Sequence, residues 1–392
     1  MFKLIKFKEV KNFFLSTSAQ GISTTFNIFF IIFLSRVSSI EYLSTYVLAN
    51  TFLPFLKFSF FDIKNKIYSD KLYLNFYFIY IFPISILLIL FLFFVLQDNK
   101  NLIFLILVIL FKFTDICSNV YISIINTKFL YKKNIKYILT KLIIVYIPTL
   151  IILHINIYLC LLYLSILNFL FNIYEVFSLK LNFIYNFKKH IRYIYQHITE
   201  GLYIITKDIS SNIIRFVVIF FYDDKTLGYF APVFLIFTLF SNIYSIIGFY
   251  FYPNLRTNLP HINTLRKVAI IFLLLLITTI LAALLVYFSD LTKFYYSIFL
   301  IPYIDEYKIL IISIIIIFPF YFFKSFFHVV FHFFKIANFL IYLELIFICL
   351  IGISAIFLNN YYGFTLLYFS YLFSLIFINL IMLRFLKRYF VK

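Results

Sequence analysis

Charged residues are scarce in this chain. They make up 12% of its 392 residues, whereas hydrophobic residues make up 64%, and the mean hydropathy is +1.03. A soluble core of this size cannot bury so many apolar side chains, which excludes a soluble globular protein. The composition therefore predicts an integral membrane protein.

Cysteine is rarer still. Each of the three cysteines stands alone within an apolar segment, without CxxC spacing: Cys117, Cys160 and Cys349. This pattern predicts neither a disulfide nor a metal site. His328 and His332 are four residues apart, but the glutamate that zinc proteases carry beside the first histidine is missing. We interpret the two histidines as an inward-facing or interfacial pair.

The sequence also lacks the motifs and loops of a membrane enzyme. It contains no GxxxxGK phosphate-binding loop, so we expect neither ATP hydrolysis by this chain nor a bound cofactor. The longest loop expected outside the cell, about 289–308, is shorter than the loops that hold catalytic groups in membrane enzymes acting on external glycans. We therefore expect that the protein is not an enzyme.

Long apolar stretches are abundant. A helix that crosses a bilayer needs about 20 mostly apolar residues, because its backbone groups must pair within the helix. The predicted spans are 12–34, 42–63, 73–96, 102–126, 137–153, 157–178, 202–222, 227–251, 268–288, 309–330, 337–358 and 364–383. The expected fold is therefore all-α, with about twelve transmembrane helices.

Basic residues alternate between the loops. With the N-terminus inside the cell, 24 of the 34 Lys and Arg residues lie on the cytoplasmic side, counting Lys141 near the start of the fifth span, and five fall in external loops. This asymmetry predicts a multi-pass protein of the cytoplasmic membrane with both termini in the cytoplasm. The net charge of +19 is spread over loops on one membrane face, beside anionic headgroups, so we expect lipids and not nucleic acid as its partners.

Two quartets of polar residues share the spacing i, i+3, i+4, i+7, which puts each quartet on one helix face. They are Gln20, Ser23, Thr24 and Asn27 in the first span, and Asp208, Ser211, Asn212 and Arg215 in the seventh. The offset of 188 residues continues as 187 between Tyr42–Leu48 and Tyr229–Leu235. The sequence thus predicts two six-helix lobes, 1–180 and 201–392, related as a parallel repeat and joined by a cytoplasmic linker at 181–200.

Three stretches carry a family resemblance. Phe29–Asp62 includes the run FLSRVSSIEYLSTYVLANTFLPFLKFSFFD, and Asp223–Leu255 includes the pair Gly228–Tyr229 and, near its end, Pro253. They resemble the first two helices and the seventh-to-eighth helix region of O-antigen and polysaccharide flippases of the MOP (MATE-like) superfamily. Asn359–Phe364, with the sequence NNYYGF, is similar to the external turn before the last helix of that family.

The resemblance implies a flippase that moves a polyprenyl-diphosphate-linked oligosaccharide across a bacterial membrane by alternating access, for surface polysaccharide or O-antigen biosynthesis. It implies a cavity between the lobes, where cations would meet the diphosphate. The candidate substrate-binding residues are Arg36, Lys57, Lys207, Asp208, Asn212, Arg215, Gln20 and Asn27. We expect a monomer, with the lipid-linked substrate, membrane lipids and a polysaccharide polymerase as candidate partners.

Several charges within the spans have a second interpretation. Lys112 and Asp115, at i, i+3, are expected to form a pair that only fixes the fourth span. Asp208 and Glu344 are candidates for binding a coupling ion, and Glu344 and Lys324 can equally hold helices together. A multidrug or small-cation exporter of the same superfamily, and a membrane-embedded glycan polymerase or ligase, remain the alternative functions.

Overall fold

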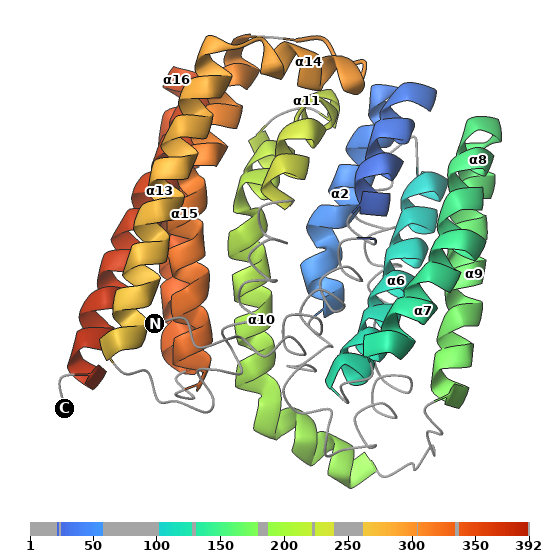
Figure 1. The fold of residues 1–392 in the computed structure, drawn as a ribbon, viewed down its shortest axis with the longest axis horizontal. Coiled ribbons are helices and arrows are strands. Elements are labelled where there is room, and N and C mark those ends of the chain that lie inside the picture. The colour runs from blue at the N-terminus through green and yellow to red at the C-terminus, as the bar shows by residue number, and fades with distance from the viewer. Residues whose placement is uncertain are drawn as a thin grey trace. The chain divides into compact units, whose positions relative to one another are not determined.

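The computed structural model describes residues 22, 25–57, 102–127, 131–178, 187–221, 224–238, 262–303, 305–333 and 337–390. Within these ranges every regular element is a helix and no strand occurs (Figure 1). The chain forms two compact units, Met1–Ile205 and Thr206–Lys392. Helix α10 (Phe187–Phe221) contains the boundary between them, so the predicted linker from residue 187 onward and the predicted seventh span up to residue 221 belong to one continuous helix.

Several described helices are long and apolar enough to cross a membrane. They are Ile135–Ile155, Ile157–Tyr174, Tyr307–His328, Asn338–Phe357 and Leu367–Phe385, and a sixth if Phe272–Phe288 and Leu291–Ile298, bent by 83°, form one span. An all-helical fold with several helices able to cross a membrane is therefore confirmed. The number twelve stays a prediction, because span 73–96 lies outside the described residues and spans 12–34, 42–63 and 227–251 lie partly outside them.

Burial follows the pattern of a protein dissolved in lipid. Large apolar side chains are exposed along whole helices, as on α13 (Ile262–Phe288) and α9 (Ile157–Ser178), whereas lysine, glutamate and asparagine side chains are buried inside the units. Exposed apolar surface on this scale is unfavourable in water and favourable against acyl chains. The distribution agrees with a multi-pass membrane protein.

The first unit is organised around α6 (Leu102–Thr127). This helix packs against α2 (Ile40–Lys57), α9 and α7 (Tyr131–Lys141) (Figure 1). A shorter apolar helix, Thr25–Val37, precedes α2, and its Phe30 ring lies 6.2 Å from that of Phe111 on α6. α8 (Ile147–Ile155) packs on α9, which is the described helix directly before α10.

A π-helical turn, Leu142–Tyr146, joins α7 to α8 within the predicted fifth span. Pro148 follows it and has no N–H to donate to the carbonyl of Ile144, four residues earlier. The hydroxyl of Tyr163 on α9 donates to that carbonyl instead, at 2.8 Å. A side chain of the neighbouring helix thus replaces the backbone bond that proline removes, as membrane helices with internal proline require.

The second unit is organised around α15 (Asp305–Phe333), which packs against α13 and α16 (Ala337–Phe390) (Figure 1). The later part of α10, the short helix α11 (Asp224–Tyr229) and the helical residues 231–238 also belong to this unit. α14 (Leu291–Ile298) is bent by 83° relative to α13. Two of its tyrosine side chains attach it to other parts of the unit. The Tyr295 hydroxyl donates to the carbonyl of Pro232, and the Tyr296 ring stacks on Tyr307 of α15 at 4.6 Å.

α16 is helical over 54 residues, yet it folds back on itself. The rings of Phe339 and Phe385 stack 4.1 Å apart, and those of Phe347 and Tyr371 lie 5.1 Å apart. A straight helix would separate residues 339 and 385 by roughly 70 Å, at about 1.5 Å per residue. α16 therefore consists of two antiparallel arms. The chain reverses between Phe347 and Tyr371, a stretch that includes the turn predicted at Asn359–Phe364.

Candidate functional site

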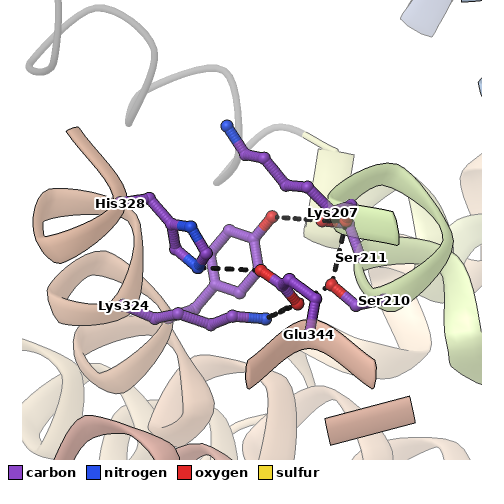
Figure 2. A network of polar contacts seen from close by, with 7 residues as sticks. Lys207, Ser210, Ser211, Lys324, His328 and Glu344 are labelled. Atoms are coloured by element: carbon purple, nitrogen blue, oxygen red, sulfur yellow. Dashed lines mark hydrogen bonds and ion pairs between the residues drawn. The ribbon is translucent and has the colours of Figure 1, made fainter. Parts of the chain in front are cut away.

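Three ionisable side chains meet inside the second unit, where α15 packs on the first arm of α16. Lys324 and His328 lie one helical turn apart on α15, so both point toward Glu344 on α16 (Figure 2). The Lys324 Nζ lies 2.7 Å from Glu344 Oε2, and the His328 Nε2 lies 2.8 Å from Glu344 Oε1. The histidine contact lacks the directionality of a hydrogen bond and is an ion pair when the imidazole is protonated. We call these three residues the triad.

The triad is almost completely shielded. Glu344 is 0% exposed, His328 2% and Lys324 3%. An isolated charge at such a position is strongly unfavourable, and pairing with hydrogen bonding is the usual remedy. Lys324 meets both conditions because its Nζ also donates to Ser210 Oγ at 3.3 Å and lies 4.0 Å from the centre of the Phe347 ring.

A chain of hydroxyl groups connects the triad with α10. Ser210 and Ser211 both donate to the carbonyl of Lys207, at 2.9 and 2.8 Å. A serine hydroxyl has a single hydrogen, so the 3.0 Å contact between Ser211 and Tyr321 must use the tyrosine as donor. The polar face of α10 is thus hydrogen-bonded to α15 at two points, while the Lys207 amino group points away from Glu344 (Figure 2).

Aromatic side chains cover the triad on the side of the second arm of α16. Tyr371 packs edge-on against Phe347, whose ring contacts the Lys324 amino group. Both Phe347 and Tyr371 are buried. Since an aromatic face attracts a cation, Phe347 stabilises the charged lysine.

The predicted seventh-span quartet shows two kinds of contact. The Asn212 amide donates to the carbonyl of Asp208 on its own helix, at 2.8 Å. Arg215 donates to Thr238 Oγ1 at 3.1 Å, and its guanidinium lies 5.0 Å from the centre of the Phe234 ring. Lys207, Asp208, Asn212 and Arg215 are all half-buried. The structure therefore brings α10 and the helical residues 231–238 together through the arginine.

Asn27 of the first unit accepts a hydrogen bond from Lys112 Nζ at 3.3 Å. Lys112 also lies within 5.0 Å of the ring centres of Tyr46 and Phe111. The expected pairing of Lys112 with Asp115 is not the one observed, because Lys112 turns to Asn27 while the Asp115 carboxylate lies 3.4 Å from Lys141.

The other predicted residues contribute less to the described geometry. Arg36 is exposed near the end of the helix Thr25–Val37. Lys57 is the last residue of α2, and its side chain lies outside the described part of the chain, as does all of Gln20. Among the described residues, no group of three or more His, Cys, Asp and Glu side chains is placed to hold a metal ion.

The two units contain contacts of the same kinds. The Asn172 amide donates to the Thr114 carbonyl at 2.9 Å, and the Asn379 amide donates to the Phe320 carbonyl at 2.8 Å. In both cases an asparagine of the sixth helix of a predicted lobe binds the backbone of the fourth helix, and the partners differ by 207 and 206 residues. The fourth and fifth helices are also joined by an ion pair in each unit, Asp115 with Lys141 and Lys324 with Glu344.

Each unit also contains a buried lysine that binds a polar side chain of another helix. Lys112 on the fourth predicted span binds a polar side chain of the first span, Asn27, and Lys324 on the tenth binds a polar side chain of the seventh, Ser210. The sequence indicated Glu344 and Lys324 as residues that can hold helices together, but it grouped His328 with His332 and not with them. The signal available was the spacing of Lys324 and His328, which places two bases on one helix face. Comparisons of the chain with protein-family models, curated proteins and solved structures give no match.

Proposed function

We propose that the protein is a flippase that moves a polyprenyl-diphosphate-linked oligosaccharide across the cytoplasmic membrane. The observation that carries the proposal is the triad within two helices able to cross a membrane, hydrogen-bonded to the polar face of α10. Ionisable side chains at such positions are expensive to insert, and they mark pathways for substrates and ions. A scaffold of the same size needs no buried charges paired between two helices.

The recurring contacts of the two units support a transporter. Equivalent asparagine, ion-pair and lysine contacts are what two halves derived from one repeat would share. Transporters of this kind work by moving one repeat against the other around a substrate site. Among such transporters, the resemblance of Phe29–Asp62 and Asp223–Leu255 to polysaccharide flippases indicates a lipid-linked oligosaccharide as the substrate class.

The charges favour an anionic substrate over a cationic drug. Glu344 contacts a base through each carboxylate oxygen, so it offers no unpaired negative charge to a cationic ligand. Lys207 and Arg215 are half-buried on α10, where a diphosphate can be gripped by a guanidinium and a point charge. This balance supports the flippase over the multidrug or small-cation exporter.

Deletion of the gene tests the proposal. Cells without the protein should lose surface glycan and accumulate lipid-linked oligosaccharide in the cytoplasmic leaflet, and the intact chain should restore the glycan. Arg215→Ala should fail to restore it at normal protein levels, and Arg215→Lys should restore it partly, because the charge survives without the bidentate fork. Lys293→Ala is the control, since Lys293 is exposed and pairs only with the exposed Asp290 in the described residues. Unaltered glycan in the deletion strain would refute the flippase.

A further inference from the structure

The bend between α13 and α14 exposes large apolar side chains at one end of the second unit. We call residues 288–300, which contain this bend of 83°, the elbow (Figure 1). Phe288 at its start is 81% exposed, and Phe294 on α14 and Leu300 after it are each 67% exposed. Side chains of this size are unfavourable in water, so the elbow needs an apolar partner.

The side chains of α14 and its two ends divide into three faces. Residues spaced i, i+3, i+7 or i, i+4, i+7 share one face of a helix. The first face is buried in the unit, the second is apolar and exposed or half-buried, and the third is polar and exposed. They consist of Thr292, Tyr296 and Phe299; of Leu291, Phe294 and Ile298; and of Asp290, Lys293 and Ser297. A helix with these three faces fits a place where protein, acyl chains and water meet.

We propose that α14 is an interfacial helix that anchors the second unit in the headgroup region of the bilayer, at the outer leaflet in the predicted topology. Its partner is the phospholipid of that leaflet. Leu291 and Phe294 contact the upper part of the acyl chains, and Lys293 faces water. This anchoring surface does not depend on the flippase function.

The length of α13 leaves α14 no part in crossing the bilayer. α13 has 27 residues and extends roughly 40 Å at about 1.5 Å per residue, which exceeds a hydrocarbon core of about 30 Å. A span that α14 completed would bring Asp290 and Lys293 toward hydrocarbon, although their side chains are 82% and 58% exposed. α13 therefore ends at the membrane surface, and α14 lies along that surface.

Two tyrosines fix α14 to the rest of the unit. The Tyr295 hydroxyl donates to the carbonyl of Pro232 at 2.9 Å, and the Tyr296 ring stacks on Tyr307 of α15 at 4.6 Å. An anchor held in this way sets the depth of its neighbours in the membrane. These neighbours are α15, which carries two residues of the triad, and the helical residues 231–238, which hold Arg215 through Thr238.

The end of α14 gives an independent reason to expect an apolar partner. The N–H of Leu300 donates to the carbonyl of Ser297 at 3.2 Å, and the N–H of Ile301 donates to that of Tyr296 at 3.4 Å. This is the pattern of a Schellman cap, in which glycine usually takes the left-handed position. Leu300 takes it here, with φ at 54° and an exposed side chain. Contact with acyl chains would offset the strain of a leucine at this position.

Fluorescence quenching tests the depth of the elbow, because the chain contains no tryptophan and a single introduced one reports on one position. The full chain is placed in phosphatidylcholine vesicles whose acyl chains carry bromine either near the headgroup or near the terminal methyl group. Phe294→Trp and Leu300→Trp should be quenched about twofold or more by the shallow bromine, and less by the deep bromine.

Two matched variants calibrate the measurement. Leu281→Trp, exposed on α13 at roughly 10 Å along the helix from Phe288, should be quenched more by the deep bromine. Ser297→Trp, on the polar face of α14, should respond to iodide in the water and not to bromine.

Two results would overturn the proposal. If bromine at neither depth affects Phe294→Trp and Leu300→Trp, lipid does not cover the elbow and a protein partner does. If the deep bromine quenches them more strongly, α14 re-enters the hydrocarbon. Leu291→Trp, on the same apolar face, decides between the outcomes if one of the two variants fails to fold.

Discussion

In the first unit an acid on the fourth predicted helix, Asp115, meets a base on the fifth, Lys141, and in the second unit a base on the tenth, Lys324, meets an acid on the eleventh, Glu344. The order of acid and base along the chain is reversed between the two pairs. The first pair is looser, at 3.4 Å with Asp115 17% exposed, and the second is tighter, at 2.7 Å with Glu344 fully buried. The comparison shows that an ion pair between consecutive helices can be built with either order of acid and base.

The largest effect is expected where the second unit departs from the first. Glu344→Gln leaves Lys324 and His328 without their carboxylate and should lower the free energy of unfolding by about 3–5 kcal/mol. Asp115→Asn should lower it by only about 1–2 kcal/mol, because that carboxylate is partly exposed and further from its partner. Thermal unfolding of the full chain in detergent measures both.

A double change separates pairing from any other role of Glu344. Glu344→Gln combined with Lys324→Met removes both members of the buried pair, so it should recover much of the stability that Glu344→Gln loses alone. If the two units lose equal stability on removal of their acids, the distinction drawn between them is wrong.

A smaller and equal effect is expected where the units agree. Asn172→Ala and Asn379→Ala each remove an amide that donates to a carbonyl of the fourth helix of a lobe, and each should cost about 0.5–1.5 kcal/mol. Asn338→Ala, at an exposed position of α16, is the matched control. A measurable cost in only one of the two variants, with the other no larger than that of Asn338→Ala, would show that the shared contact is a coincidence of geometry.

The smallest effect concerns the π turn, Leu142–Tyr146, which lies in the fifth helix of the first unit, whereas the corresponding arm of α16 is regular in its described residues. Tyr163→Phe should destabilise by about 1 kcal/mol, because the Ile144 carbonyl loses its donor. In a Pro148→Ala background the helix regains an N–H, so the same change should cost less. Tyr174→Phe, exposed on α9, is the control. An equal cost in both backgrounds would show that the Tyr163 hydroxyl does not compensate for the hydrogen bond that Pro148 removes.

Apolar run length predicts the position of a membrane helix because insertion depends on composition, and the spans at 137–153, 309–330 and 337–358 match described helices closely. The pairing of charges is not predictable in this way. Spacing within one helix suggests Lys112 with Asp115, but each finds a partner on another helix, since helix rotation and packing decide which side chains meet. The triad could not be predicted either without knowing how the helices pack, because Glu344 is close to Lys324 only once α16 packs on α15.

The order of the paired residues along the chain has a consequence for how the protein enters the membrane. In each unit the partners lie on consecutive helices, Asp115 before Lys141 and Lys324 before Glu344, separated by 26 and 20 residues. A lone lysine or acid costs about 2.5–3.5 kcal/mol at the centre of an inserting helix and less toward its ends. A helical hairpin that inserts as one piece brings both members into lipid already neutralised, so neither helix must cross alone with a bare charge. The spacing of the pairs therefore predicts that the helices insert into the membrane as hairpins, two at a time.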